Sequence, residues 1–131
     1  MNQKTQEFEE RLIQFALSVT QIAESLPKTN LGRYIRDQLT RSGLSSSFNY
    51  GEAQFAESKL DFIHKLKICL KELKEVHISL KFVRYKPLID DSNKIIIAEI
   101  ECCELISIFV KSVETTRRNM LEAQLEKNPA S

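Results

Sequence analysis

The side chains that could bind a metal ion are few in this sequence of 131 residues, which contains 2 His and 3 Cys. Asp61 and His64 stand at positions i and i+3, so a helix would present both on one face. Carboxylate-bridged di-iron bundles use this spacing twice, together with further glutamates. Here it occurs once, because His77 has no carboxylate at the matching position. We therefore interpret Asp61 and His64 as solvated neighbours, with metal or small-ligand binding as a minor alternative.

The sequence does not indicate nucleophilic catalysis. Cys102 and Cys103 are adjacent, so on a helix they point about 100° apart and cannot chelate one ion together. An odd number of cysteines fits reduced thiols in a core or an interface better than disulfides. The sequence has no nucleophile elbow, Gly-rich phosphate loop or HExxH motif. We expect no enzyme activity and no cofactor.

A polar stripe is the least expected pattern in the chain. Its residues continue the register of Leu31 and Ile35 at spacings of four and three: Gln38, Ser42, Ser45, Asn49 and Glu52. Buried amides and carboxylates are costly unless they are hydrogen-bonded. We predict a polar network that sets helix register, in which Glu52 accepts from a nearby Lys, Tyr or backbone group. A small polar pocket or a groove for a partner is the functional alternative.

Charge is unevenly distributed although the formal net charge is only +1. Residues 26–56 and 57–87 carry +2 and +4, whereas residues 1–25 and 88–131 carry −2 and −3. The total argues against a strongly basic nucleic-acid binder. The basic middle leaves a local site for RNA or DNA phosphates open, and its candidate contacts are Arg33, Arg36, Arg41, Lys67, Lys71, Lys74 and Lys81. The alternative is an ordinary solvated face.

Four helical segments must position these residues, over about residues 5–25, 30–55, 58–85 and 91–125. Apolar residues recur at spacings of four and three, which indicates helices rather than strands. In the first segment these are Phe8, Leu12, Phe15, Val19, Ile22 and Leu26, and in the third Phe62, Leu66, Cys69, Leu73, Val76, Leu80 and Val83. Candidate caps are Thr29 or Asn30, Ser58, and the pair Asp90 and Asp91. Short connections predict an all-α, antiparallel up-down-up-down four-helix bundle.

Two of these segments are unusual. All three glycines lie in the second, where we expect a kink or break between Ser45 and Tyr50. The fourth carries two apolar stripes, the first formed by Ala98, Cys102, Ile106, Phe109 and Val113. The second stripe, Ile96, Ile100, Cys103 and Val110, needs a partner outside the bundle, most simply another subunit.

Composition bounds the remaining possibilities. With 3 Gly and 3 Pro, the chain has too few turn residues for a β-sandwich or a Rossmann unit. Its length fits one domain, residues 1–131, in which we expect the tail from Glu126 to be frayed. No apolar run is long enough to span a bilayer, and the N-terminus MNQKTQEFEER has no signal-peptide core. We therefore expect a cytoplasmic protein that does not contact a membrane.

The polar stripe and the third segment together resemble a known family. Gln38 and Arg41, followed by Ser45, Asn49 and Glu52, match the signature Q-x-x-R-x-x-x-S-x-x-x-N-x-x-E. The segment SKLDFIHKLKICLKELKE is similar to the third helix of the same family, with its acidic–aromatic pair at Asp61 and Phe62. This is the four helix bundle protein family, also called 23S rRNA intervening-sequence proteins.

The resemblance, which spans about residues 8–122, implies a bacterial homopentamer around a central channel with no known enzyme activity. The chain is more distantly similar to the accessory variability proteins of diversity-generating retroelements, which form basic pentamers that bind nucleic acid. We accordingly expect a ring-shaped homo-oligomer, either a weak RNA-associated scaffold or a protein-assembly module without nucleic-acid binding.

Overall fold

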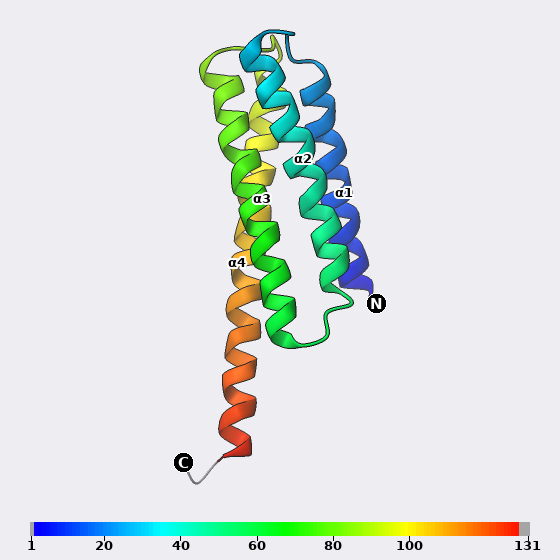
Figure 1. The fold of residues 1–131 in the computed structure, drawn as a ribbon, viewed down its shortest axis with the longest axis vertical. Coiled ribbons are helices and arrows are strands. Elements are labelled where there is room, and N and C mark those ends of the chain that lie inside the picture. Colours follow the sequence, from blue (N-terminus) through cyan, green and yellow to red (C-terminus); the bar gives the residue numbers. More distant parts are fainter. Residues whose placement is uncertain (1, 129–131) are drawn as a thin grey trace.

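The computed structural model describes residues 2–128, which form four α-helices joined by short connections. The helices are α1 (Gln3–Glu24), α2 (Asn30–Ala53), α3 (Lys59–Tyr85) and α4 (Ser92–Lys127). Consecutive helices run in opposite directions, and α4 returns beside α1 (Figure 1). No strand occurs in this range. The predicted all-α four-helix bundle is confirmed.

Each helix begins at a side chain that accepts a hydrogen bond from a backbone N–H in the first turn. Ser58 caps α3 as predicted, accepting from Asp61 N. Of the paired candidates, Thr29 caps α2 and Asp91 caps α4. At the start of α1, Asn2 accepts from Thr5 N. These caps satisfy donors that would otherwise be left unpaired at the helix ends.

The apolar stripes of α1 and α3 form the core as predicted. Every member is buried except Phe8 and Phe62, which are partly buried against it. At one end of the core, Phe8, Tyr50 and Phe109 form an edge-to-face aromatic cluster with ring centroids 5.0–5.8 Å apart. The 4-3 spacing alone therefore identifies which face of these two helices is inside.

Three of the four helix seams are extensive, whereas α1 and α4 contact each other much less. Besides the Phe8–Phe109 ring contact, ion pairs join these two helices. The Arg11 guanidinium lies 2.7 Å from Glu101 Oε1 and 3.0 Å from Glu104 Oε1. The hydrogen bond to Glu101 raises the pKa of Arg11 above its ordinary value.

The α2 helix corrects two expectations. It is unbroken through Ser45–Tyr50. The serine hydroxyls there form hydrogen bonds to backbone carbonyls of the same helix, and these bonds are compatible with helical geometry. Ser46 and Ser47 donate to the carbonyls of Gly43 and Leu44, three residues earlier.

The polar stripe is also not the inward face of α2. Of its members only Ser42 is buried, Gln38, Ser45 and Asn49 are half-buried, and Glu52 is exposed. The inward face shifts by one residue after Ser42 and continues through Ser46, Tyr50 and Ala53.

The α4 helix is longer than its neighbours and continues past the end of the bundle where α3 begins (Figure 1). Its first apolar stripe is buried, apart from the half-buried Ile106, and its second stripe is exposed, as the two-stripe pattern predicts. The helix runs to Lys127, two residues beyond its expected end. Of the tail expected to be frayed, residues 126 and 127 are helical, and residues 129–131 lie outside the described residues.

Candidate nucleic-acid interface

An ion-pair network occupies the seam between α2 and α3. Arg41 Nη1 lies 3.1 Å from Glu72 Oε2, and Arg41 Nη2 lies 2.8 Å from Glu75 Oε2 and also donates to Gln38. Ser42 Oγ donates to the same Glu75 oxygen at 2.9 Å. The hydrogen bond from Arg41 lowers the pKa of Glu75, and Glu75 in turn raises the pKa of Arg41.

This network places Arg41 in a structural role. The Glu72 side chain is only 9% exposed, so its carboxylate depends on the arginine as its cation. The Arg41 guanidinium already donates to two carboxylates, so fewer of its N–H groups are available to bind a phosphate. The predicted contact Arg41 therefore joins the polar stripe rather than a free basic surface.

The lower half of the polar stripe is also satisfied within the protein. Asn49 Nδ2 donates to the Ser45 backbone carbonyl at 2.9 Å and to Ser45 Oγ at 3.1 Å. Glu52 accepts from Lys65 Nζ at 3.0 Å, which confirms the prediction that a nearby lysine, tyrosine or backbone group satisfies it. The stripe thus joins α2 to α3 at both ends.

A basic strip remains on the outer face of α3. Lys67, Lys71 and Lys74 are all exposed and lie at spacings of four and three, so they project from one side of the helix. None of the three forms an ion pair with another residue between positions 2 and 128. With Leu70, Ile78 and Glu75, whose carboxylate is paired with Arg41, they line a shallow depression on the surface. We call the three lysines the α3 lysine strip.

The other predicted basic contacts lie toward the opposite end of α3. Because α2 and α3 are antiparallel and Arg41 meets Glu75, the residues of α2 before Arg41 face the end of α3 that carries Lys81. Arg33 and Arg36 are exposed there, and Arg36 lies 3.7 Å from Asp37. The described structure therefore separates them from Lys67.

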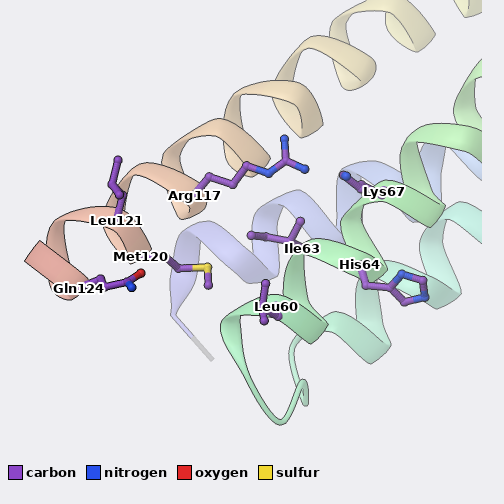
Figure 2. A pocket seen from close by; sticks show the side chains of 8 residues that line it. All are labelled: Leu60, Ile63, His64, Lys67, Arg117, Met120, Leu121 and Gln124. Carbon is purple, nitrogen blue, oxygen red and sulfur yellow. The ribbon is translucent and has the colours of Figure 1, made fainter.

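A cleft of about 470 Å³ adjoins the Lys67 end of the strip, between the first turns of α3 and the last turns of α4. Its floor is apolar, formed by Leu60, Ile63, Met120 and Leu121. Figure 2 shows Arg117 extending from α4 toward Lys67 on α3, and His64 of α3 also borders the cleft. The cleft therefore combines an apolar floor with cationic groups from two helices.

Arg117 was not among the predicted contacts. Residues 88–131, which contain it, are acidic overall, so the charge pattern did not indicate a basic site there. The antiparallel packing of α3 and α4 places Arg117 in the same cleft as Lys67. The visible signal is its position seven residues after Val110 on the exposed stripe of α4.

The second α4 stripe forms an exposed apolar surface. Ile100 is 62% exposed, and Ile96, Cys103 and Val110 are exposed beside it. The stripe borders α3, where Arg84 Nε donates to Glu99 at 2.7 Å and Cys103 Sγ lies 3.4 Å from His77 Nε2. Exposed apolar stripes of this kind are typical of interaction surfaces.

The minor metal hypothesis gains no support from the described residues. Nowhere in residues 2–128 do three His, Cys, Asp or Glu side chains gather closely enough to hold an ion. Asp61 accepts a hydrogen bond from the Glu57 backbone N–H, and His64 lines the basic cleft.

The comparisons with known proteins bear on the family and the fold. The family model for the 23S rRNA-intervening sequence protein matches residues 4–108. The chain belongs to that family. Among curated proteins, none matches it significantly.

The fold also matches a crystal structure of a protein of unknown function from the S23 ribosomal protein family of Bacteroides thetaiotaomicron. The match has a TM-score of 0.73 and 25% sequence identity, and it covers 80% of this chain and 96% of the other. The crystal structure aligns with only part of this chain, and the family match ends at residue 108, within α4.

None of the four helices is both long enough and apolar enough across residues 2–128 to cross a membrane.

Proposed function

We propose that this family member is a self-assembling, non-enzymatic helical scaffold that binds RNA or DNA phosphates along the α3 lysine strip. The observation that carries the proposal is the alignment of three lysines, unpaired within residues 2–128, on one face of α3. Arg41, Lys65 and Arg84 are each paired with a glutamate, whereas Lys67, Lys71 and Lys74 are exposed without an acidic partner in the described structure. Unpaired cations in a row are what a phosphate backbone requires.

Arg117 and the cleft extend this surface by one cation from a second helix. Four cations would release few counterions, so a single chain should bind weakly and with little sequence preference. Repetition of the strip around an oligomer would raise the overall affinity through multivalency. We propose a homopentamer in the cytoplasm as the assembled form, in keeping with the resemblance.

Titration of labelled single-stranded RNA at low salt tests the proposal. Charge reversal at Lys67, Lys71 and Lys74 should weaken binding at least tenfold. The matched control reverses Lys28, Lys86 and Lys94, which are exposed at the other end of the bundle and change the net charge equally. Equal weakening in both variants would mean that only net charge matters, and the strip would lose its role.

A protein-assembly module without nucleic-acid binding is the second candidate, and the exposed α4 stripe favours it. An interface that covers Ile100 and Val110 should be disrupted by Ile100→Glu or Val110→Glu, because each places a carboxylate in an apolar contact. Sedimentation of the variants measures this. A discrete oligomer that the variants dissolve, with no RNA binding at low salt, would favour this candidate over the first.

A further inference from the structure

An apolar groove runs along the outer face of α1 and α2, where the sequence patterns predicted no site. It has a volume of about 700 Å³. Five large apolar residues line it: Ile13, Leu17, Leu44, Phe48 and Phe55. Phe48 and Phe55 are 70% and 83% exposed, which is unusual for side chains of this size on an isolated soluble protein. A groove between two antiparallel helices has the shape that accepts a third helix.

The same chain carries a helical segment that is only partly covered. The last turns of α4 extend beyond the bundle (Figure 1), and they meet α3 only at the cleft described above. Leu121 borders that cleft, yet Leu121 and Leu125 remain 60% and 61% exposed. These two leucines stand one turn apart, which is the spacing of anchor residues on a helix that binds a groove. The segment lies outside residues 4–108, so the family match does not account for it.

The groove and the segment lie at the same end of the molecule. The groove runs from the middle of α1 and α2 to the end of α2, and this end of the bundle is the one from which α4 projects (Figure 1). Both surfaces therefore lie toward the same end of each chain.

Charge on the two surfaces is complementary. The charged residues that line the groove are Glu9 and Glu52, of which Glu52 is already paired with Lys65. On a helix with about 100° per residue, Arg117 and Arg118 both lie within about 60° of the line through Leu121 and Leu125. Glu122 and Glu126 lie at least about 80° from that line. Arg117 turns toward the cleft with Lys67, which leaves Arg118 as the residue best placed to meet a groove glutamate.

We infer that the α1–α2 groove binds the end of α4 from a second copy of the chain. Leu121 and Leu125 fill the groove between Leu17 and Phe48, and Arg118 pairs with Glu9. This inference rests on the self-assembly proposed above and names surfaces other than the α4 stripe. Insertion of each α4 end into the groove of the next chain is a head-to-tail contact, which closes into a ring such as the homopentamer proposed above.

Light scattering after size-exclusion chromatography tests the inference on the full chain. The wild type should elute as a multiple of 15.1 kDa, and Leu121→Glu combined with Leu125→Glu should shift it toward a smaller species. Phe48→Glu should give the same shift. All three side chains are exposed in the single chain, so the variants should keep the helical circular dichroism of the wild type.

A charge exchange provides the sharper test. Arg118→Glu should weaken association at least tenfold, and adding Glu9→Arg should restore most of it, because Glu9, unlike Glu52, has no ion-pair partner within residues 2–128. Glu122→Arg is the matched control, because it changes the charge in the same turn outside the proposed contact, and it should have little effect.

Two results would overturn the inference. A wild type that is monomeric at all concentrations would leave the groove to a different protein. An oligomer that Ile100→Glu dissolves but the Leu121, Leu125 and Phe48 variants do not would place the interface on the α4 stripe alone. That second result would leave the proposed scaffold function standing.

Discussion

Replacement of Arg41 by methionine should destabilise the bundle more than any other single change of an exposed cation. The variant removes the hydrogen bonds at 3.1 and 2.8 Å to Glu72 and Glu75 and leaves two carboxylates side by side. Breaking a fully buried pair costs about 3–5 kcal/mol, whereas an exposed pair contributes roughly 0–1 kcal/mol.

The structure places this network between those limits. The Glu72 side chain is 9% exposed, but that of Arg41 is 52% exposed, so solvent screens much of the interaction. We therefore expect a loss of about 1–3 kcal/mol in the free energy of unfolding. Urea unfolding followed by circular dichroism at a fixed protein concentration measures it.

The pH dependence gives the prediction a sign. Because the pKa of Glu75 is lowered in the folded protein, its contribution is present above the ordinary glutamate pKa and is lost as pH falls through the folded value. The difference between wild type and Arg41→Met should thus be largest near neutral pH and should shrink on acidification. Arg36→Met is the control, since Arg36 has only a 3.7 Å contact with Asp37. Equal stability of the two variants at neutral pH, or a gap that does not narrow in acid, would refute the reasoning.

Two further predictions concern the glycines and the cysteines. Gly32→Ala should destabilise the protein, because a Cβ there would lie 1.9 Å from the Pro27 carbonyl oxygen. Gly51→Ala meets no atom within 4 Å and should stabilise α2 by about 0.5–1 kcal/mol. Thermal melts of both variants measure these effects, and a stabilised Gly32→Ala would contradict the first. Burial raises the pKa of Cys69 and of Cys102 to about 12, so in the native protein a disulfide reagent should modify only Cys103 near neutral pH, with all three thiols reacting after denaturation. Rapid modification of two native thiols would show that the core opens more readily than its packing indicates.

The inward faces of α1 and α3 could be predicted from sequence because their apolar spacing is continuous. The exposed second stripe of α4 could also be predicted, because a helix cannot bury both stripes in one core. The inward face of α2 could not, since its polar stripe matches the same spacing and only packing decides between Ser45 and Ser46.

The candidate surfaces depend on contacts between distant parts of the chain. The lysine strip was visible as a run on one helix, but the pairing of Arg41 with Glu72 and Glu75 required knowing how α2 and α3 align. Likewise, that Arg117 shares a cleft with Lys67 depends on how α3 and α4 align. The role of Phe48 and Phe55 could not be predicted from spacing, since their exposure alone makes them unusual.

The salt dependence of RNA binding tests the central proposal most directly. Removing one phosphate-binding cation should reduce the slope of log K against log salt by about 0.7 for a single strand. Reversal of Lys67, Lys71 and Lys74 should therefore lower the slope by about 2, and reversal of Lys28, Lys86 and Lys94 should leave it unchanged. Absence of RNA binding by the wild type at low salt, or the same slope in both variants, would contradict the account.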